Sequence, residues 1–120
     1  MQISITGRHM DITDAIREHA HERLERSLLE FPRIQSVHLI LDIEKYRHFA
    51  EVVIHAAKNI RIDAKEESED MYVSIDRAID KAQKQLRRIQ DKRQDHKSRD
   101  GIADVEIEVQ SMIDRDKKNK

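Results

Sequence analysis

Residues 37–64, VHLILDIEKYRHFAEVVIHAAKNIRIDA, decide the fold, because apolar and polar side chains alternate along them in three successive runs. Alternation with a period of two is typical of strands that bury one face and expose the other. The apolar faces of the three runs consist of Val37, Leu39, Leu41 and Ile43, of Ala50, Val52, Ile54 and Ala56, and of Ile60, Ile62 and Ala64. A polar turn at residues 44–48 joins the first two runs. A tight turn at Lys58 and Asn59 joins the last two, since Asn tolerates left-handed backbone geometry. The stretch therefore predicts three antiparallel strands in a meander.

The residues before this meander predict one more strand and a helix. Gln2 to Thr6 alternates in the same way and predicts a short strand, which Gly7 ends at a position expected to need a positive φ. Thr13 is expected to cap a helix whose apolar residues recur every four positions. These residues are Ile16, Ala20, Leu24 and Leu28. Pro32 ends this helix at about Phe31, because proline disfavours helical geometry in the residue before it.

A second, longer helix is predicted from Asp70 to about Arg99, with Ser68 as its N-cap. One apolar stripe runs along it and consists of Ile75, Ile79, Ala82, Leu86 and Ile89. The order of elements is therefore β-α-β-β-β-α. A sheet with one apolar face and two helices with one apolar stripe each can bury one another. We expect an α+β two-layer sandwich, with a four-stranded sheet and both helices on one face.

Length and composition limit the class of protein. The 120 residues suffice for one domain, expected at residues 1–99, and an acidic, mixed-charge tail at residues 100–120 that we expect to be flexible. The absence of Cys excludes a disulfide framework and thiolate ligands. The sequence contains no basic, apolar leader and no run approaching about 18 apolar residues. We therefore expect a cytoplasmic protein that does not associate with membranes.

The positive charge of the chain is concentrated on the long helix. Between residues 77 and 99 there are nine Lys or Arg and three Asp, whereas the whole chain has a net charge of −1. This concentration predicts a polyanionic partner, and RNA is the best candidate. With two Phe, two Tyr and no Trp, we expect contacts to phosphates rather than base stacking. The alternative is a solvated face with pairs inside the helix, such as Asp80 with Lys84 and Arg87 with Asp91.

Patterns for catalysis and metal binding are weak. The serines lie in no Gly-flanked elbow, and the two Gly of the chain cannot form a Gly-rich phosphate loop. Asp42, Glu44 and Glu51 share one face of the predicted sheet, where solvated carboxylates are usual. His38 and His55 could be neighbours across strands, but no third ligand is evident. We expect no enzyme activity, cofactor, small-molecule substrate or metal.

Several short motifs follow one another in the order of a known family. They are Ile5–His9 with Ile12–Glu18, Val37–Leu39 with Glu44–Glu51, Glu69–Tyr72 with Ser74–Asp76, and Asp80–Lys81 with Gln85–Arg88. Over about residues 1–97 the chain resembles the ribosome hibernation promoting factor and ribosome-associated inhibitor A family, in its short, sigma-modulation-protein-like form. The resemblance implies the same β-α-β-β-β-α fold, which is similar to a double-stranded RNA-binding domain.

The resemblance also implies a function. Members of this family bind the small ribosomal subunit at the decoding region of its 16S rRNA, where they overlap the sites of messenger RNA and transfer RNA. Translation then stops by steric occlusion in stationary phase or stress, without catalysis. The implied RNA-binding residues are Arg23 and Arg26 on the first helix, Lys45, Arg47 and His48 in the polar turn, and Lys81, Lys84, Arg87, Arg88 and Lys92 on the second helix. Gln90 departs from the pattern, because many members have a basic residue there.

Two alternatives stay open. Short family members either promote or block the pairing of ribosomes. Residues 101–120 look more like the blocking type, yet Val105, Ile107 and Val109 alternate as in a strand that could add to a sheet edge or to another copy. Off the ribosome we expect a monomer. The rival function is a protein-interaction adaptor, in which the long helix or this strand docks a regulatory partner such as a sigma factor.

Overall fold

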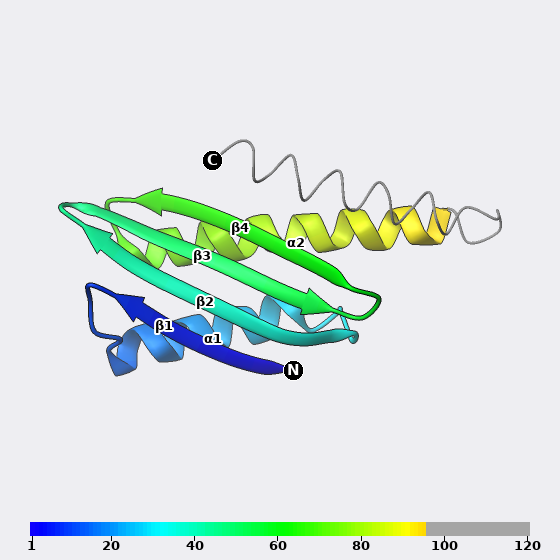
Figure 1. Cartoon of the computed structure of the whole chain (residues 1–120), viewed down its shortest axis with the longest axis horizontal. Helices are drawn as coiled ribbons and strands as arrows, with labels where there is room; N and C mark the ends of the chain where they lie inside the picture. Colours follow the sequence, from blue (N-terminus) through cyan, green and yellow to red (C-terminus); the bar gives the residue numbers. More distant parts are fainter. Residues whose placement is uncertain (96–120) are drawn as a thin grey trace.

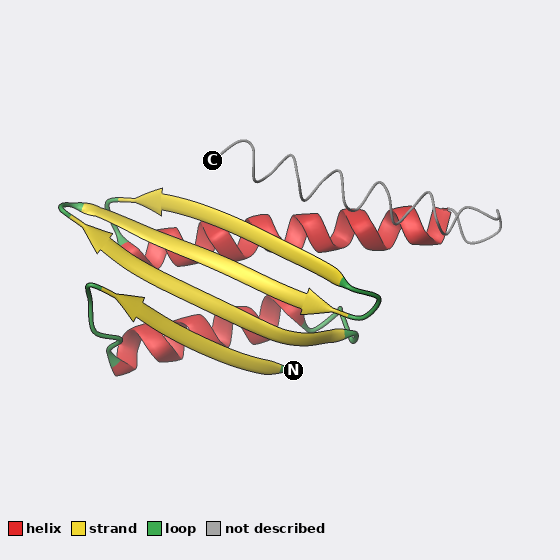
Figure 2. Cartoon of the chain, in the orientation of Figure 1, coloured by secondary structure: helices red, strands yellow, loops and turns green. Residues whose placement is uncertain are grey.

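Four strands form one sheet in the order β1-β2-β3-β4, and two helices cover one of its faces (Figure 1, Figure 2). The computed structural model describes residues 1–95. Its elements are β1 (Gln2–Arg8), α1 (Asp14–Leu28), β2 (Ile34–Glu44), β3 (Arg47–Ala56), β4 (Ile60–Ser68) and α2 (Met71–Asp95). The predicted order of elements and the two-layer arrangement are confirmed.

The strand pairing follows from the connections. β1 is parallel to β2, whereas β2, β3 and β4 are antiparallel, as the meander predicts. One row of partners across the sheet is Ile5, Leu39, Val52 and Ala64. A parallel pair needs a crossover connection, and α1 supplies it between β1 and β2.

The core lies between the sheet and the helices. Leu24 of α1, Leu39 of β2, Val52 of β3, and Ile75 and Ile79 of α2 are completely buried. Burial of a large aliphatic side chain contributes about 1.5–3 kcal/mol to the folded state. Because nearly all the apolar positions predicted from the sequence are buried here, the hydrophobic effect fixes which face of each element turns inward.

Gly7 contradicts the prediction made for it. β1 continues through Gly7 to Arg8, and the positive φ lies at His9, at 56°, not at Gly7. A Cβ atom at Gly7 would lie 2.7 Å from the carbonyl oxygen of Met10 and 3.0 Å from Cδ1 of Ile12. Close approach of the chain, rather than a left-handed backbone, therefore requires glycine at this position.

One of the two predicted helix caps is confirmed and the other is wrong. Thr13 Oγ1 accepts a hydrogen bond from the Ile16 amide at 3.1 Å and caps α1. Ser68 belongs to β4 and does not cap α2. Instead Asp70 Oδ1 accepts a hydrogen bond from the Tyr72 amide at 2.8 Å, while Ser68 Oγ accepts one from the Asp70 amide at 3.1 Å. Asp70 is therefore the residue that satisfies the exposed end of α2.

The turns of the meander use left-handed residues. Lys58 and Asn59 have φ angles of 65° and 61°, which confirms the predicted tight turn. Lys45, in the turn between β2 and β3, has a φ of 58°. These backbone angles let β2, β3 and β4 follow one another with short connections.

Several predicted boundaries lie close to, or beyond, the described part of the chain. α1 ends at Leu28, before the predicted end at Phe31. α2 continues to Asp95, and its predicted end at Arg99 lies outside the described residues. The same holds for the division between a domain at 1–99 and a tail at 100–120, and for the strand-like pattern at Val105–Val109.

Candidate nucleic-acid interface

α1 and α2 lie side by side and run in the same direction (Figure 1). A row of polar contacts joins them, and we call this row the helix seam. Its donor–acceptor distances range from 2.6 to 2.9 Å. The seam consists of the pairs His19–Asp76, Arg23–Asp80, Ser27–Gln83 and Glu30–Arg87. These contacts lie on the side of α2 that faces α1, and together with the buried apolar stripe they determine which of its cations face outward.

Three cations of α2 point away from the sheet and from the seam. They are Arg77, Lys84 and Arg88, which we call the outer stripe. All three are exposed, and their spacing of seven and four residues places them on one helix face, over about 16 Å at 1.5 Å per residue. Within residues 1–95, none of the three makes an ion pair. The outer stripe is therefore free to contact phosphate groups.

Arg77 was missed among the predicted site residues, although it lies on the same face as Lys84 and Arg88. The spacing of seven between Arg77 and Lys84 was the signal that could have found it. The sequence alone could not show that the nearby Lys81 points toward β4 and not outward with Arg77 and Lys84. Lys81 Nζ is 3.6 Å from Glu66 Oε2 of β4, so this predicted RNA-binding residue faces the sheet edge.

The predicted pairs inside α2 are replaced by pairs between elements. Asp80, which could have paired with Lys84, accepts a hydrogen bond from Arg23 Nη2 at 2.6 Å. Arg87, which could have paired with Asp91, donates from Nη2 to Glu30 Oε1 at 2.6 Å. The hydrogen bond and the negative charge of Glu30 raise the pKa of the Arg87 guanidinium. Lys84 is consequently exposed. Arg87 pairs with Glu30 in the seam, and about half of its side chain is also exposed to solvent.

The two predicted residues of α1 have different surroundings. The Arg23 side chain is only 24% exposed, since Asp80 and Asp76 both lie against its guanidinium. Arg26 is well exposed and lies 3.8 Å from Glu22, one turn earlier on α1. A contact of this length between exposed side chains contributes little. Arg26 can turn toward a partner, whereas Arg23 cannot do so without leaving two carboxylates.

The turn between β2 and β3 lies at the end of the sheet where α2 begins (Figure 1). Of the residues predicted there, Lys45 belongs to this turn, whereas Arg47 and His48 are the first two residues of β3. There Ser74 Oγ of α2 donates to the carbonyl oxygen of His48 at 2.7 Å. From Ser74 to Arg88 the helix rises about 21 Å. The structure therefore separates the predicted turn residues from the distal end of the outer stripe.

Of these three predicted residues, Lys45 is exposed, whereas Arg47 and His48 are half-buried. Arg47 Nε donates to Glu67 Oε2 at 3.0 Å, and this hydrogen bond raises the pKa of the Arg47 guanidinium. The Nδ1 atom of His48 is buried, and within residues 1–95 it has no hydrogen-bond partner. A contact with RNA at this end therefore depends on Lys45 more than on its two neighbours.

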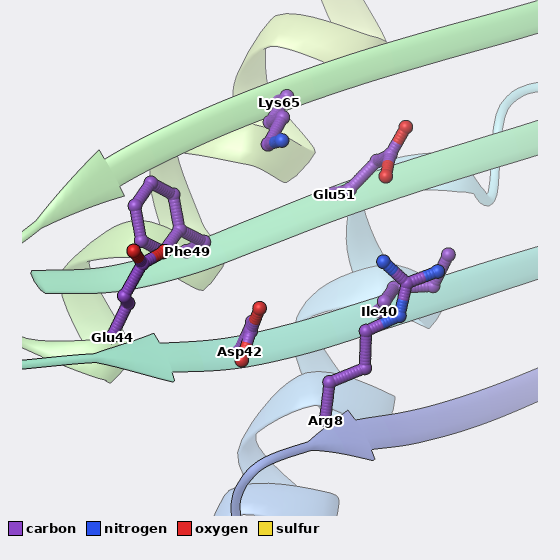
Figure 3. Close-up of a pocket in the computed structure, with 7 residues that line it drawn as sticks. All are labelled: Arg8, Ile40, Asp42, Glu44, Phe49, Glu51 and Lys65. Atoms are coloured by element: carbon purple, nitrogen blue, oxygen red, sulfur yellow. The ribbon is translucent and has the colours of Figure 1, made fainter.

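The face of the sheet opposite the helices carries mixed charge. A shallow depression there is lined by Arg8, Ile40, Asp42, Glu44, Phe49, Glu51 and Lys65 (Figure 3). Its three carboxylates and two cations largely offset one another, and Asp42 Oδ1 is also 3.0 Å from Nδ1 of His9. This face therefore attracts a polyanion much less strongly than the outer stripe does.

The two histidines predicted as neighbours across strands do meet on this face. The rings of His38 and His55 are 6.3 Å apart in an edge-to-face arrangement, and Ser4 Oγ lies 2.6 Å from Nδ1 of His38. Over residues 1–95, no group of three or more His, Cys, Asp or Glu side chains is placed to hold a metal ion. In the same part of the chain, neither helix has the length and apolar character needed to cross a membrane.

Comparisons with known proteins match this arrangement to one family. A family model described as sigma 54 modulation protein / S30EA ribosomal protein matches residues 3–94. The ribosome hibernation promoting factor of Salmonella typhimurium is 38% identical over 96 residues, which are 80% of this chain and all of that protein. The factor of the same name from Escherichia coli K12 is 36% identical over the same shares.

Two solved structures have the same fold. A ribosomal subunit interface protein from Coxiella burnetii superposes with a TM-score of 0.71 at 30% identity, over 75% of this chain and 98% of that one. The N-terminal domain of Protein Y from Thermus thermophilus superposes with a TM-score of 0.66 at 29% identity, over 73% of this chain and 98% of that one.

Proposed function

Because the chain belongs to the family of sigma 54 modulation proteins and S30EA ribosomal proteins, we propose that it is a ribosome hibernation factor. In this proposal it binds the small ribosomal subunit at the decoding region of the 16S rRNA, in the cytoplasm. It then inhibits translation in stationary phase or stress by occupying the sites of messenger RNA and transfer RNA. The mechanism is steric and requires neither catalysis nor a cofactor.

The observation that carries the proposal is the coincidence of two independent features. Relatives named ribosome hibernation promoting factor match over their whole length. The long helix also presents three cations, Arg77, Lys84 and Arg88, on one exposed face, and none of them makes an ion pair within the described residues 1–95. Cations in such a row bind the phosphate backbone with an affinity that falls steeply with salt. The likeness therefore supports a ribosomal partner, and in this proposal the outer stripe binds its phosphate groups.

Co-sedimentation with purified small subunits and whole ribosomes at two salt concentrations tests the proposal. The wild-type protein should sediment with the small subunit at low salt and dissociate as salt rises. If each stripe residue meets one phosphate, a slope of about −0.9 per contact predicts roughly a fortyfold loss of affinity between 50 and 200 mM salt. The triple variant Arg77→Glu/Lys84→Glu/Arg88→Glu should not sediment with subunits at either salt concentration.

A matched control reverses the same number of charges elsewhere. Arg8 and Lys65 lie on the open face of the sheet, and Arg33 precedes β2; all three are exposed. The variant Arg8→Glu/Arg33→Glu/Lys65→Glu therefore has the same net charge as the stripe variant and should retain binding. If both variants lose binding equally, net charge rather than the outer stripe is responsible. The proposed site is then wrong.

A second function is favoured by the family description, which names a sigma 54 modulation protein. In that case the chain is an adaptor that binds a regulatory protein such as a sigma factor. Salt distinguishes the two functions, because a largely apolar protein interface loses little affinity between 50 and 200 mM salt. If the protein fails to sediment with ribosomes at low salt but binds a sigma factor without salt dependence, the adaptor is the correct function.

A further inference from the structure

We propose that Arg23 is a positioning residue. It pairs with Asp76 and Asp80, so that these carboxylates do not pair with the cations of the outer stripe. Arg23 itself makes no phosphate contact. The inference rests on the proposed function, since it concerns the RNA-binding surface. It changes the role that the resemblance implies for this residue. It also places the border of the RNA-binding surface at the helix seam.

The geometry encloses Arg23 between two carboxylates of α2. Its Nη2 donates to Asp80 Oδ1 at 2.6 Å, and its Nε is buried, 3.4 Å from Asp76 Oδ1. Asp76 Oδ1 also lies 2.8 Å from Nε2 of His19, whose ring meets the edge of Tyr72 at 5.1 Å between centroids. A phosphate would have to displace Asp80 and Asp76 to reach this guanidinium. By contrast, none of the three exposed cations of the outer stripe makes an ion pair with a carboxylate in the described part of the chain.

Asp80 has a position in α2 that makes its partner important. It lies three residues after Arg77 and four residues before Lys84, and side chains at these spacings are neighbours on a helix surface. Without Arg23, the Asp80 carboxylate would pair with one of these two cations. Arg23 removes this competitor by holding Asp80 on the seam side. A cation of α1 thereby frees a cation of α2.

The remaining surface of α1 supports a border at the seam. Its exposed carboxylates are Asp14, Glu18, Glu22 and Glu25, whereas its exposed cations are Arg17 and Arg26. Glu22 and Glu25 lie near Arg26 and His21, at 3.8 and 3.7 Å. An acidic helix surface repels a phosphate backbone. The RNA therefore contacts α2 on the side away from α1.

The test is the salt dependence of binding to small ribosomal subunits, measured for the wild type, Arg23→Gln, Arg23→Gln/Asp80→Asn and Lys84→Gln. Positioning predicts that Arg23→Gln binds roughly threefold to tenfold more weakly at low salt, because Asp80 then engages a stripe cation. The double variant should recover both the affinity and the slope of the wild type. Lys84→Gln, the reference for a lost phosphate contact, should reduce the slope by about one.

A direct phosphate contact predicts a different result for the double variant. Its slope would stay lower by about one, as in Lys84→Gln, and its affinity would not recover. That outcome overturns the inference. A merely structural role would shift the thermal unfolding midpoint of Arg23→Gln and leave the slope of the folded protein unchanged, which also overturns it.

If Arg23→Gln does not fold, Arg23→Lys replaces it. Lysine keeps one cation against Asp80, so positioning predicts the wild-type slope, and a reduced slope contradicts it.

The same experiment separates this inference from the proposed function. If the wild-type protein does not bind small subunits even at low salt, the proposed function fails and the variants are not informative about RNA. If the wild type binds but the double variant does not recover, the function stands and only the role of Arg23 is wrong.

Discussion

Replacing Gly7 by Ala should destabilise the protein, for a reason that differs from the usual one for glycine. The new Cβ atom would lie 2.7 Å from the carbonyl oxygen of Met10, which is backbone and cannot rotate away, and 3.0 Å from Cδ1 of Ile12. Overpacking of this kind costs about 1–3 kcal/mol. The reduced entropy of the unfolded chain offsets about 0.4–1 kcal/mol of this cost. The net loss is about 1–2 kcal/mol, which lowers the thermal unfolding midpoint by roughly 5–15 °C for a domain of this size.

Comparison of Gly7→Ala with Gly7→Asn tests the reasoning. If close approach requires glycine, Asn should be at least as destabilising as Ala, because its side chain is larger. If a left-handed backbone were the reason, Asn would be the better tolerated of the two. Urea unfolding monitored by circular dichroism measures both free energies of unfolding. An Asn variant that is clearly more stable than the Ala variant would refute the steric explanation.

Two further predictions concern the core and the start of α2. Leu39→Ala should lower the free energy of unfolding by about 2–5 kcal/mol, because Leu39 is completely buried at the centre of the sheet; a loss below 1 kcal/mol in urea unfolding would contradict this packing. Asp70→Ala should cost about 0.5–2 kcal/mol, since it removes the acceptor for the Tyr72 amide. Asp70→Asn keeps a capping oxygen and should cost clearly less, and equal losses in thermal unfolding would show that Asp70 is not the cap.

The strands and the buried faces were predictable from the sequence because their signals are local. An alternation of apolar residues, as in Val37 and Leu39, needs no knowledge of what lies on the other side of the core. The N-cap Thr13 was found for the same reason, because its partner Ile16 is three residues away. Local periodicity therefore accounts for most of the fold.

The errors concern positions whose environment comes from elsewhere in the chain. The sequence predicts a left-handed backbone at Gly7, because it cannot show that Met10 and Ile12 fold back against this residue. The sequence predicts Ser68 as the cap of α2 because the apolar pattern of the preceding strand ends at Ala64, whereas β4 continues to Ser68. In both cases tertiary contacts decided between two local geometries that the sequence allowed.

The candidate site was predicted at the level of the helix but not of the single residue. The charge count identified α2 as the basic element. It could not distinguish Lys81, Lys84 and Arg87 from one another. Only the structure shows that Lys81 pairs with Glu66 and that Arg87 pairs with Glu30. Local alternatives such as the pair of Asp80 with Lys84 were equally compatible with the sequence.

The helix seam has a consequence for how this chain can tolerate changes in length. Three of its contacts join residues that are 57 positions apart, at His19 and Asp76, Arg23 and Asp80, and Glu30 and Arg87. An insertion in a turn of the meander changes this number equally for every contact and leaves the seam intact. One residue inserted inside α2 rotates everything after it by about 100°. Length variation in descendants of this sequence should therefore accumulate between the helices, while the residue count within each helix stays fixed.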